Sequence, residues 1–165
     1  MSRDDYRILA ARIRAELADI ERLVAKAERA AALIRQHPEE ELYVDAAAHN
    51  LHDFYSAVER LLLQIARTVD RSVPSGERWH RDLLEQMRLP VSAVRPPVLS
   101  EEVSFQMEEY LRFRHVVRHV YSFRIDPQRV LSLVEAVRPL FQRLTQQLNQ
   151  FAQMLEQWSS EAEHG

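Results

Sequence analysis

Arginine and histidine side chains are concentrated in one stretch, Arg112 to Tyr121, of an otherwise acidic chain. That stretch holds three arginines and two histidines, and from Arg112 to Arg129 five arginines face a single acidic residue, Asp126. The 165-residue chain as a whole has a formal charge of −3. Arginine offers a planar fork that matches phosphate, and histidine can exchange a proton near neutral pH. The stretch therefore either binds an anionic ligand or forms a solvated basic helix face.

In a helix, the spacing of this stretch sorts its polar side chains into two stripes. At about 100° per residue, Arg114, Arg118 and Tyr121 share one stripe, and His115 and His119 share another. Arg114 and His119 would then flank a groove in which a phosphate could meet both. A zinc site at the two histidines is disfavoured, because no Glu follows the first His as a zincin motif requires.

Other polar and aromatic residues suggest less chemistry. His49 and His52 are three residues apart and could touch, but without a third ligand we interpret them as partly buried, hydrogen-bonded side chains rather than a metal site. Glu59 is interpreted as an ordinary polar residue of the second expected helix. Trp79 is expected to anchor the core, and the sequence assigns no role to His80 beside it.

The composition excludes several classes of protein. The absence of cysteine rules out disulfides, a thiolate nucleophile and a cysteine-based zinc site. No apolar run approaches the length that spans a bilayer, and the charged N-terminus lacks a signal core. We therefore expect a cytoplasmic protein with one domain over residues 1–165, no membrane partner, no metal and no cofactor.

Two glycines in the chain and sustained three-to-four-residue apolar spacing predict long helices with few tight turns. The expected fold is an all-α bundle of four long helices and one short helix. The first expected helix runs from Arg3 to Gln36 with a Ser2–Asp5 capping box, and the second runs from between Glu39 and Ala46 to about Arg71. A short third helix runs from Glu77 to about Leu89 and is capped by Ser75. The fourth runs from Ser100 through the basic stretch to a break at Phe123 to Asp126, and the last runs from Pro127 to about Ser159.

The basic stretch resembles the sequence motif of a known protein family. Arg114, His119 and Tyr121 are spaced as in the Arg-x4-His-x-Tyr motif of HepT-like toxins, members of the HEPN superfamily. The resemblance covers roughly residues 45 to 135, and it includes the segments Leu51 to Tyr55, Glu59-Arg60, Pro74 to His80, Leu111 to Val116 and Phe123 to Pro127. It implies a HEPN-type helical bundle.

Two features depart from the family pattern. The family often has Asn directly after the motif Arg, where this chain has His115. Arg112 also fits the looser Arg-to-His spacing of the superfamily, although Tyr121 favours the register that uses Arg114.

The resemblance implies the toxin of a type VII toxin–antitoxin pair. Such toxins cleave RNA without a metal at a cleft between two protomers, and a partner nucleotidyltransferase of the MNT type silences them by attaching AMP to the motif tyrosine. The implied catalytic residues are Arg114, His119 and Tyr121, with Tyr121 also the AMPylation site. Arg112, Arg118 and His115 would bind substrate phosphate, the protein would be a homodimer, and no DNA partner is expected.

The residue chemistry agrees with this implication. Transesterification of RNA needs a group that moves a proton, which His119 can do, and fixed positive charge at the phosphorane, which Arg114 can supply. The alternative is a catalytically inactive HEPN module that binds nucleotides or a nucleotidyltransferase.

Overall fold

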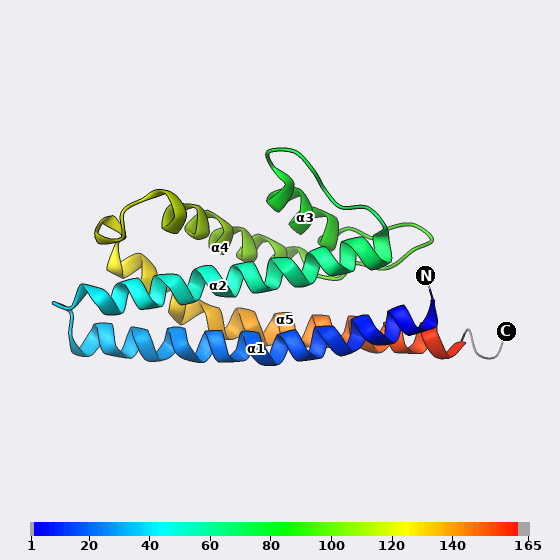
Figure 1. Cartoon of the computed structure of the whole chain (residues 1–165), viewed down its shortest axis with the longest axis horizontal. Helices are drawn as coiled ribbons and strands as arrows, with labels where there is room; N and C mark the ends of the chain where they lie inside the picture. Colours follow the sequence, from blue (N-terminus) through cyan, green and yellow to red (C-terminus); the bar gives the residue numbers. More distant parts are fainter. Residues whose placement is uncertain (1, 162–165) are drawn as a thin grey trace.

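The computed structural model describes residues 2–161, which form five α-helices. The helices are α1 (Arg3–Gln36), α2 (Glu41–Ile65), α3 (Trp79–Arg88), α4 (Glu101–His119) and α5 (Pro127–Glu161) (Figure 1). A π-helical turn, Ala66–Asp70, continues α2, and a 3-10 turn, Ser122–Arg124, lies between α4 and α5. The described residues form no β-strand, only one isolated bridge. The expected all-α bundle of four long helices and one short helix is confirmed.

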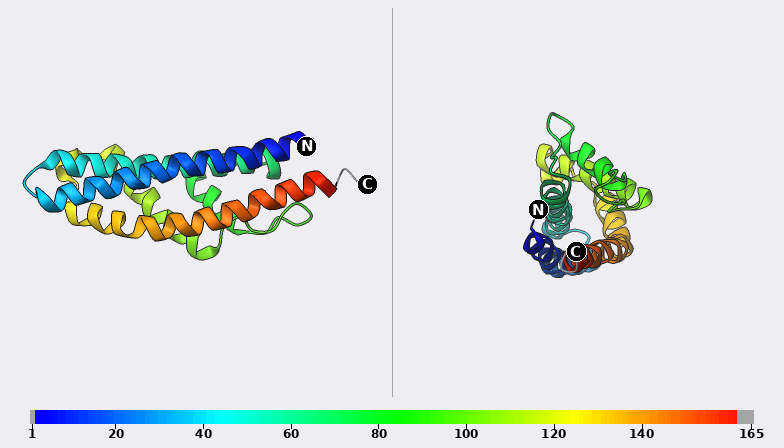
Figure 2. Two further views of the ribbon diagram at one scale, coloured as in Figure 1. Left: turned by 90° about the horizontal axis from the view of Figure 1, so that it is seen from below. Right: turned by 90° about the vertical axis from the view of Figure 1, so that its right-hand side faces the viewer.

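The four long helices surround a common core. Viewed end-on, α1 lies between α2 and α5, and α4 completes the bundle on the far side of α2 (Figure 2). The short α3 packs outside this bundle against α2 and α4. The start of α1 and the end of α5 lie at the same end of the molecule (Figure 1). None of the described helices is both long and apolar enough to cross a membrane.

The starts of α1, α4 and α5 form where short-range sequence signals predict them. Ser2 and Asp5 make the expected capping box, with Ser2 N–H donating to Asp5 at 2.8 Å. Ser100 accepts from Val103 N–H at 3.2 Å to open α4. Asp126 accepts from Gln128 N–H at 3.0 Å at the start of α5, whose first residue is proline.

Periodic apolar side chains bury one side of α1 against α2 and α5. The buried side chains recur every three or four residues: Leu9, Ala10, Ile13, Leu17, Ile20, Val24, Ala27, Ala30, Ala31 and Ile34. Each large apolar side chain buried in this way stabilises the fold by roughly 1.5–3 kcal/mol.

Ion pairs on the rim of the bundle join α1 to α5. Arg138 pairs with Glu21 and Glu28, and Arg35 pairs with Glu135 at 2.9 Å. Because these groups are partly exposed, each pair stabilises by no more than about 1 kcal/mol. The pairs fix how the two helices align more than they hold them together.

Two sequence-based boundaries and one predicted cap were wrong. α3 begins at Trp79 rather than Glu77, and its N-cap is Arg78 without a side-chain hydrogen bond, so Ser75 does not cap it. α4 ends at His119, before Tyr121, because Val120 is already extended (φ −120°, ψ 141°). A β-branched residue at that position favours the extended backbone.

The connector between α3 and α4, expected only to be extended, is held in place by hydrogen bonds of one buried arginine. Arg95 is buried and donates to both carboxylate oxygens of Asp70, at 2.5 and 2.7 Å. Its remaining N–H groups donate to the carbonyls of Gln86, Leu89 and Pro96. This arginine fastens the connector to the end of α2.

Candidate functional site

Arg114 lies on the flank of α4 that faces α2. The neighbouring Phe113 is in the core, which leaves the Arg114 side chain half-buried. Its Nε donates to the Ser56 hydroxyl on α2 at 3.1 Å. Neither of its terminal nitrogens has a hydrogen-bond partner within residues 2–161. The guanidinium is therefore fixed at one nitrogen and available at two, as binding of a phosphate requires.

His119, the last residue of α4, has an ordered imidazole. Its Nδ1 lies 2.8 Å from the backbone oxygen of His115, and the two imidazole rings stack at 4.0 Å. A carbonyl oxygen can only accept, so Nδ1 carries the hydrogen and Nε2 is the free nitrogen. An exposed imidazole with one nitrogen held can transfer a proton through the other.

Tyr121 does not lie on the helical stripe of Arg114. It follows the end of α4, its side chain is 72% exposed, and no described contact joins it to Arg114. Its ring stacks on Phe123, which is 67% exposed, with centroids 5.5 Å apart and planes 6° from parallel. The prediction that one helix face presents both Arg114 and Tyr121 was wrong, because helical periodicity was extended beyond the last helical residue.

The other basic residues lie on different sides of α4. Arg118 and His115 are exposed one turn from Arg114 and His119. Arg112 is also exposed, but it is turned about 160° from Arg114 and lies 3.9 Å from Glu108. Of the three expected phosphate contacts, Arg118 and His115 are therefore better placed than Arg112 to share a ligand with Arg114.

Sequence reasoning missed a polar cluster on α2. Glu59 is not an ordinary polar position, because only 7% of its side chain is exposed. Its Oε2 accepts from the Tyr55 hydroxyl at 2.8 Å and lies 2.6 Å from Nδ1 of His80 on α3. The signal was present in the helical spacing, since Glu59 lies four residues after Tyr55 and three before Leu62, which are both in the core.

The electrostatics of this cluster reach Arg114. Burial raises the pKa of the Tyr55 hydroxyl well above its usual value near 10, and the Glu59 carboxylate raises the pKa further. The positive charge of Arg114 acts in the opposite direction, and the negative charge of Glu108 adds to the increase. The Tyr55 hydroxyl is therefore close enough to respond to charges on both α2 and α4.

His49 and His52 do not form a metal centre. His49 is more exposed than expected and lies 3.2 Å from Asp53, and His52 contacts the same carboxylate at 3.3 Å. Within residues 2–161, no three His, Asp or Glu side chains converge as metal ligands. The interpretation as hydrogen-bonded histidines holds, except that His49 is exposed.

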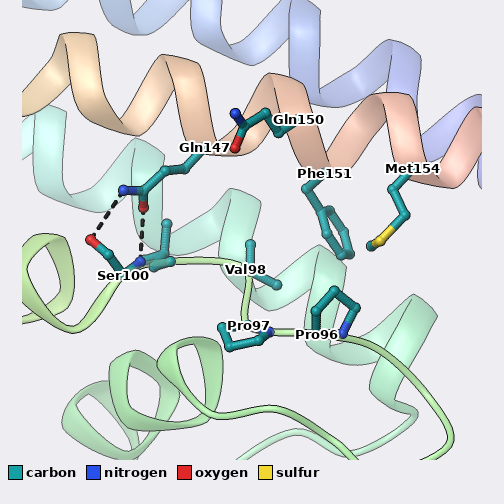
Figure 3. Close-up of a pocket in the computed structure, with 9 residues that line it drawn as sticks. Pro96, Pro97, Val98, Ser100, Gln147, Gln150, Phe151 and Met154 are labelled. Atoms are coloured by element: carbon teal, nitrogen blue, oxygen red, sulfur yellow. Dashed lines mark hydrogen bonds between the residues drawn. The ribbon is translucent and has the colours of Figure 1, made fainter.

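A pocket of about 330 Å³ lies at the opposite end of α4 from His119 (Figure 3). The connector before α4 and one side of α5 line it, and Gln147 crosses its edge to bond Ser100. Its walls are Pro96, Pro97, Val98, Leu99, Ser100, Gln147, Gln150, Phe151 and Met154. None of these side chains titrates near neutral pH, so the pocket offers no acid or base that could activate its one hydroxyl, Ser100, which accepts from Val103 N–H and Gln147.

The all-α bundle, with Arg114 and His119 near the end of α4, agrees with the expected HEPN-type architecture. Residues 46–155 match the family described as HepT-like protein. The match spans more than half of the chain and contains α4 with its Arg114 and His119, so the chain belongs to the HepT-like family. No curated protein and no solved structure matches the chain.

Proposed function

We propose that this protein is the toxin of a toxin–antitoxin pair and acts as a metal-independent endoribonuclease. The observation that carries the proposal is unneutralised positive charge at the end of α4. Among the described residues, neither Arg114 nor Arg118 has a carboxylate within ion-pair distance, whereas Arg95 and Arg138 are fully paired. A phosphodiester would supply the missing negative charge.

The proposed reaction is attack by the ribose 2′-oxygen on the adjacent phosphorus. One group removes the 2′-hydroxyl proton, the new O–P bond forms, the bond to the 5′-oxygen breaks, and that oxygen receives a proton. His119 supplies a proton-transfer group through Nε2, and Arg114 stabilises the charge of the phosphorane. The products are a 2′,3′-cyclic phosphate and a free 5′-hydroxyl, and the reaction needs no metal.

Exposed aromatic rings beside the motif favour single-stranded RNA as the substrate. Tyr121 and Phe123 present stacked rings to solvent, and the Arg124 guanidinium lies 6.0 Å from the Phe123 ring. A base that stacks on such rings contributes about 1–3 kcal/mol to binding. Unpaired RNA offers both the free bases and the flexible backbone that this surface requires.

The same surface supports a homodimer. Val120, Tyr121 and Phe123 are exposed apolar or aromatic residues. They follow Arg118, which has no ion-pair partner among the described residues, and this combination is typical of an interface rim. A two-fold axis here would place two copies of Arg114 and His119 on one strand of RNA.

The proposed partner is an MNT-type nucleotidyltransferase that attaches AMP to Tyr121. The Tyr121 ring is highly exposed, and its hydroxyl has no partner in residues 2–161. An attached phosphodiester adds a charge of about −1 that can pair with nearby arginines and exclude RNA. With the partner enzyme, ATP and magnesium, the intact mass should rise in AMP-sized steps, and Tyr121→Phe should show no increase.

Activity on RNA with and without His119 tests the proposed function. Purified protein should cleave an unstructured RNA oligonucleotide in EDTA, and His119→Ala should lower the rate by about 10²-fold or more with an unchanged helical CD spectrum. His37→Ala is the matched control, because His37 lies at the exposed junction of α1 and α2. Undiminished cleavage by His119→Ala, or activity that EDTA abolishes and zinc restores, would overturn the mechanism.

A further inference from the structure

Within one protomer the motif offers a single proton-transfer group, whereas the proposed reaction must both remove and deliver a proton. In the proposed homodimer the second group is either the partner's His119 or another imidazole of the same protomer. His119 can do one of these tasks, and Arg114, which stays charged, can do neither. The reaction therefore requires a second imidazole near Arg114, with one nitrogen held by a hydrogen bond and the other accessible.

His80 meets this description at the first turn of α3. Its Nδ1 lies 2.6 Å from Oε2 of Glu59, and its ring stacks on Trp79 with centroids 3.6 Å apart. The carboxylate can only accept, so Nδ1 carries the hydrogen and Nε2 bears the lone pair when the ring is neutral. The side chain is 26% exposed, and no described residue bonds to Nε2.

The packing of α3 brings His80 toward the motif. α3 runs antiparallel to α4, since Ser104 bonds the Leu84 carbonyl at 3.0 Å and Arg81 lies 3.7 Å from Glu108 further along. His80 is thus at the end of α3 nearest His115 and His119. On α4, Ser104, Glu108, His115 and His119 recur along one flank at helical spacing.

α2 gives the same placement independently. Ser56, which holds Arg114, precedes Glu59, which holds His80, by three residues. Residues three apart on a helix are neighbours on its surface, about 5–6 Å apart between Cβ atoms. Arg114 and His80 are therefore held by adjacent positions of one helix.

Helix geometry directs the two imidazoles toward the same part of α4. Side chains in a helix tilt toward its N-terminus, and because α3 is antiparallel to α4 this tilt carries His80 toward the C-terminal end of α4. His119 tilts back along α4, as its bond to the His115 carbonyl shows. Arg114 lies between the levels of the two histidines along α4.

We propose that His80, oriented by Glu59, is the second proton-transfer group of the RNA cleavage reaction. Neutral His80 takes the 2′-hydroxyl proton at Nε2 as the O–P bond forms, and protonated His119 delivers a proton to the departing 5′-oxygen. Glu59 keeps Nδ1 protonated and stabilises the imidazolium that forms, as a carboxylate does for a catalytic histidine. The assignment deepens the proposed function and rests on it.

α3 and the two helices packed against it carry charged and titratable groups of both signs. They are Tyr55 and Glu59 on α2, Arg81 on α3, and Glu108, Arg112 and Arg114 on α4. Glu59 contacts His80 directly as a hydrogen-bond acceptor, and the Tyr55 hydroxyl donates to the same Glu59 oxygen.

His80→Asn is the decisive variant, because the Asn amide can keep a hydrogen bond to Glu59 but cannot transfer a proton. We expect kcat for the unstructured RNA to fall by about 10²-fold or more, with little change in KM and in the midpoint of thermal unfolding. The acidic limb of the pH profile of kcat/KM, which reports the base, should disappear. Glu59→Gln should lower kcat less than His80→Asn does. The control His37→Asn should change neither kcat nor the pH profile.

The outcomes separate this inference from the proposed function. Wild-type protein that does not cleave RNA defeats both. Wild type that cleaves, with His119→Ala inactive but His80→Asn fully active and the acidic limb intact, defeats only the assignment of His80. A lower unfolding midpoint for His80→Asn with a normal kcat and pH profile shows that the Glu59–His80 contact is purely structural, and also overturns the assignment.

Discussion

Glu59 and Asp70 are both buried carboxylates, on α2 and on the π-helical turn that continues it, but their partners differ. Asp70 accepts from the fully buried Arg95 through both oxygens and from Gln86 through one. Glu59 accepts through Oε2 from Tyr55 and bonds His80, whose ring reaches solvent. The Asp70 pair is a charge pair with all its arginine donors used, whereas the Glu59 pair contains an imidazole whose Nε2 has no partner among the described residues.

This difference separates a structural ion pair from a candidate for chemistry. Burial and short contacts are common to both carboxylates, so neither property identifies a functional site. The distinguishing property is a partner with a titratable atom left free. Variants at the two clusters should therefore affect different measurements.

The largest effect on stability is expected at the Asp70 cluster. Arg95→Ala leaves the buried Asp70 carboxylate without its charged partner, which should lower the free energy of unfolding by about 3–5 kcal/mol. Urea unfolding followed by CD at 222 nm measures the change. The folded fraction should keep its rate of RNA cleavage, and a loss below about 1 kcal/mol would show that the pair is dispensable.

A smaller loss of stability is expected at the Glu59 cluster. Tyr55→Phe removes one neutral donor to Glu59 but leaves His80 in place, so the free energy of unfolding should fall by about 1–3 kcal/mol. The same urea titration provides the comparison with Arg95→Ala. A loss as large as that of Arg95→Ala would mean that His80 does not compensate the Glu59 charge.

The smallest effect should appear only at high pH. The folded-state pKa of Tyr55 is raised above the unfolded value near 10, so its contribution to stability is complete below pH 10 and declines as pH rises further. Wild-type protein should lose stability above pH 10 more steeply than Tyr55→Phe. Equal slopes for the two proteins in urea titrations between pH 9 and 11 would contradict the raised pKa.

The sequence predicted features that depend on local signals. The capping box at Ser2, the cap at Ser100 and the Asp126-Pro127 start of α5 each need only neighbouring residues, and the structure confirms all three. The membership of the HepT-like family was also predicted correctly. Whether Arg114, His119 and Tyr121 act as expected remains a prediction.

The features that the sequence did not predict depend on contacts between distant segments. Glu59 and His80 are 21 residues apart, and they meet only because α3 folds back across α2. Arg95 and Asp70 are separated by 25 residues, and no periodic pattern marks either residue. Tyr121 was misplaced for a different reason, because a motif spacing does not reveal where its helix ends.

The side-by-side course of α1 and α5 also has a consequence for biosynthesis (Figures 1 and 2). α1 and α2 can pair as a hairpin soon after they leave the ribosome, but the second apolar flank of α1 needs α5, which is made after all the other helices described here. Contacts this far apart in sequence carry a large loop-closure entropy and slow folding. The nascent chain therefore holds an uncovered apolar strip on α1 until α5 has emerged, and α4 with Arg114 and His119 emerges before the bundle can close.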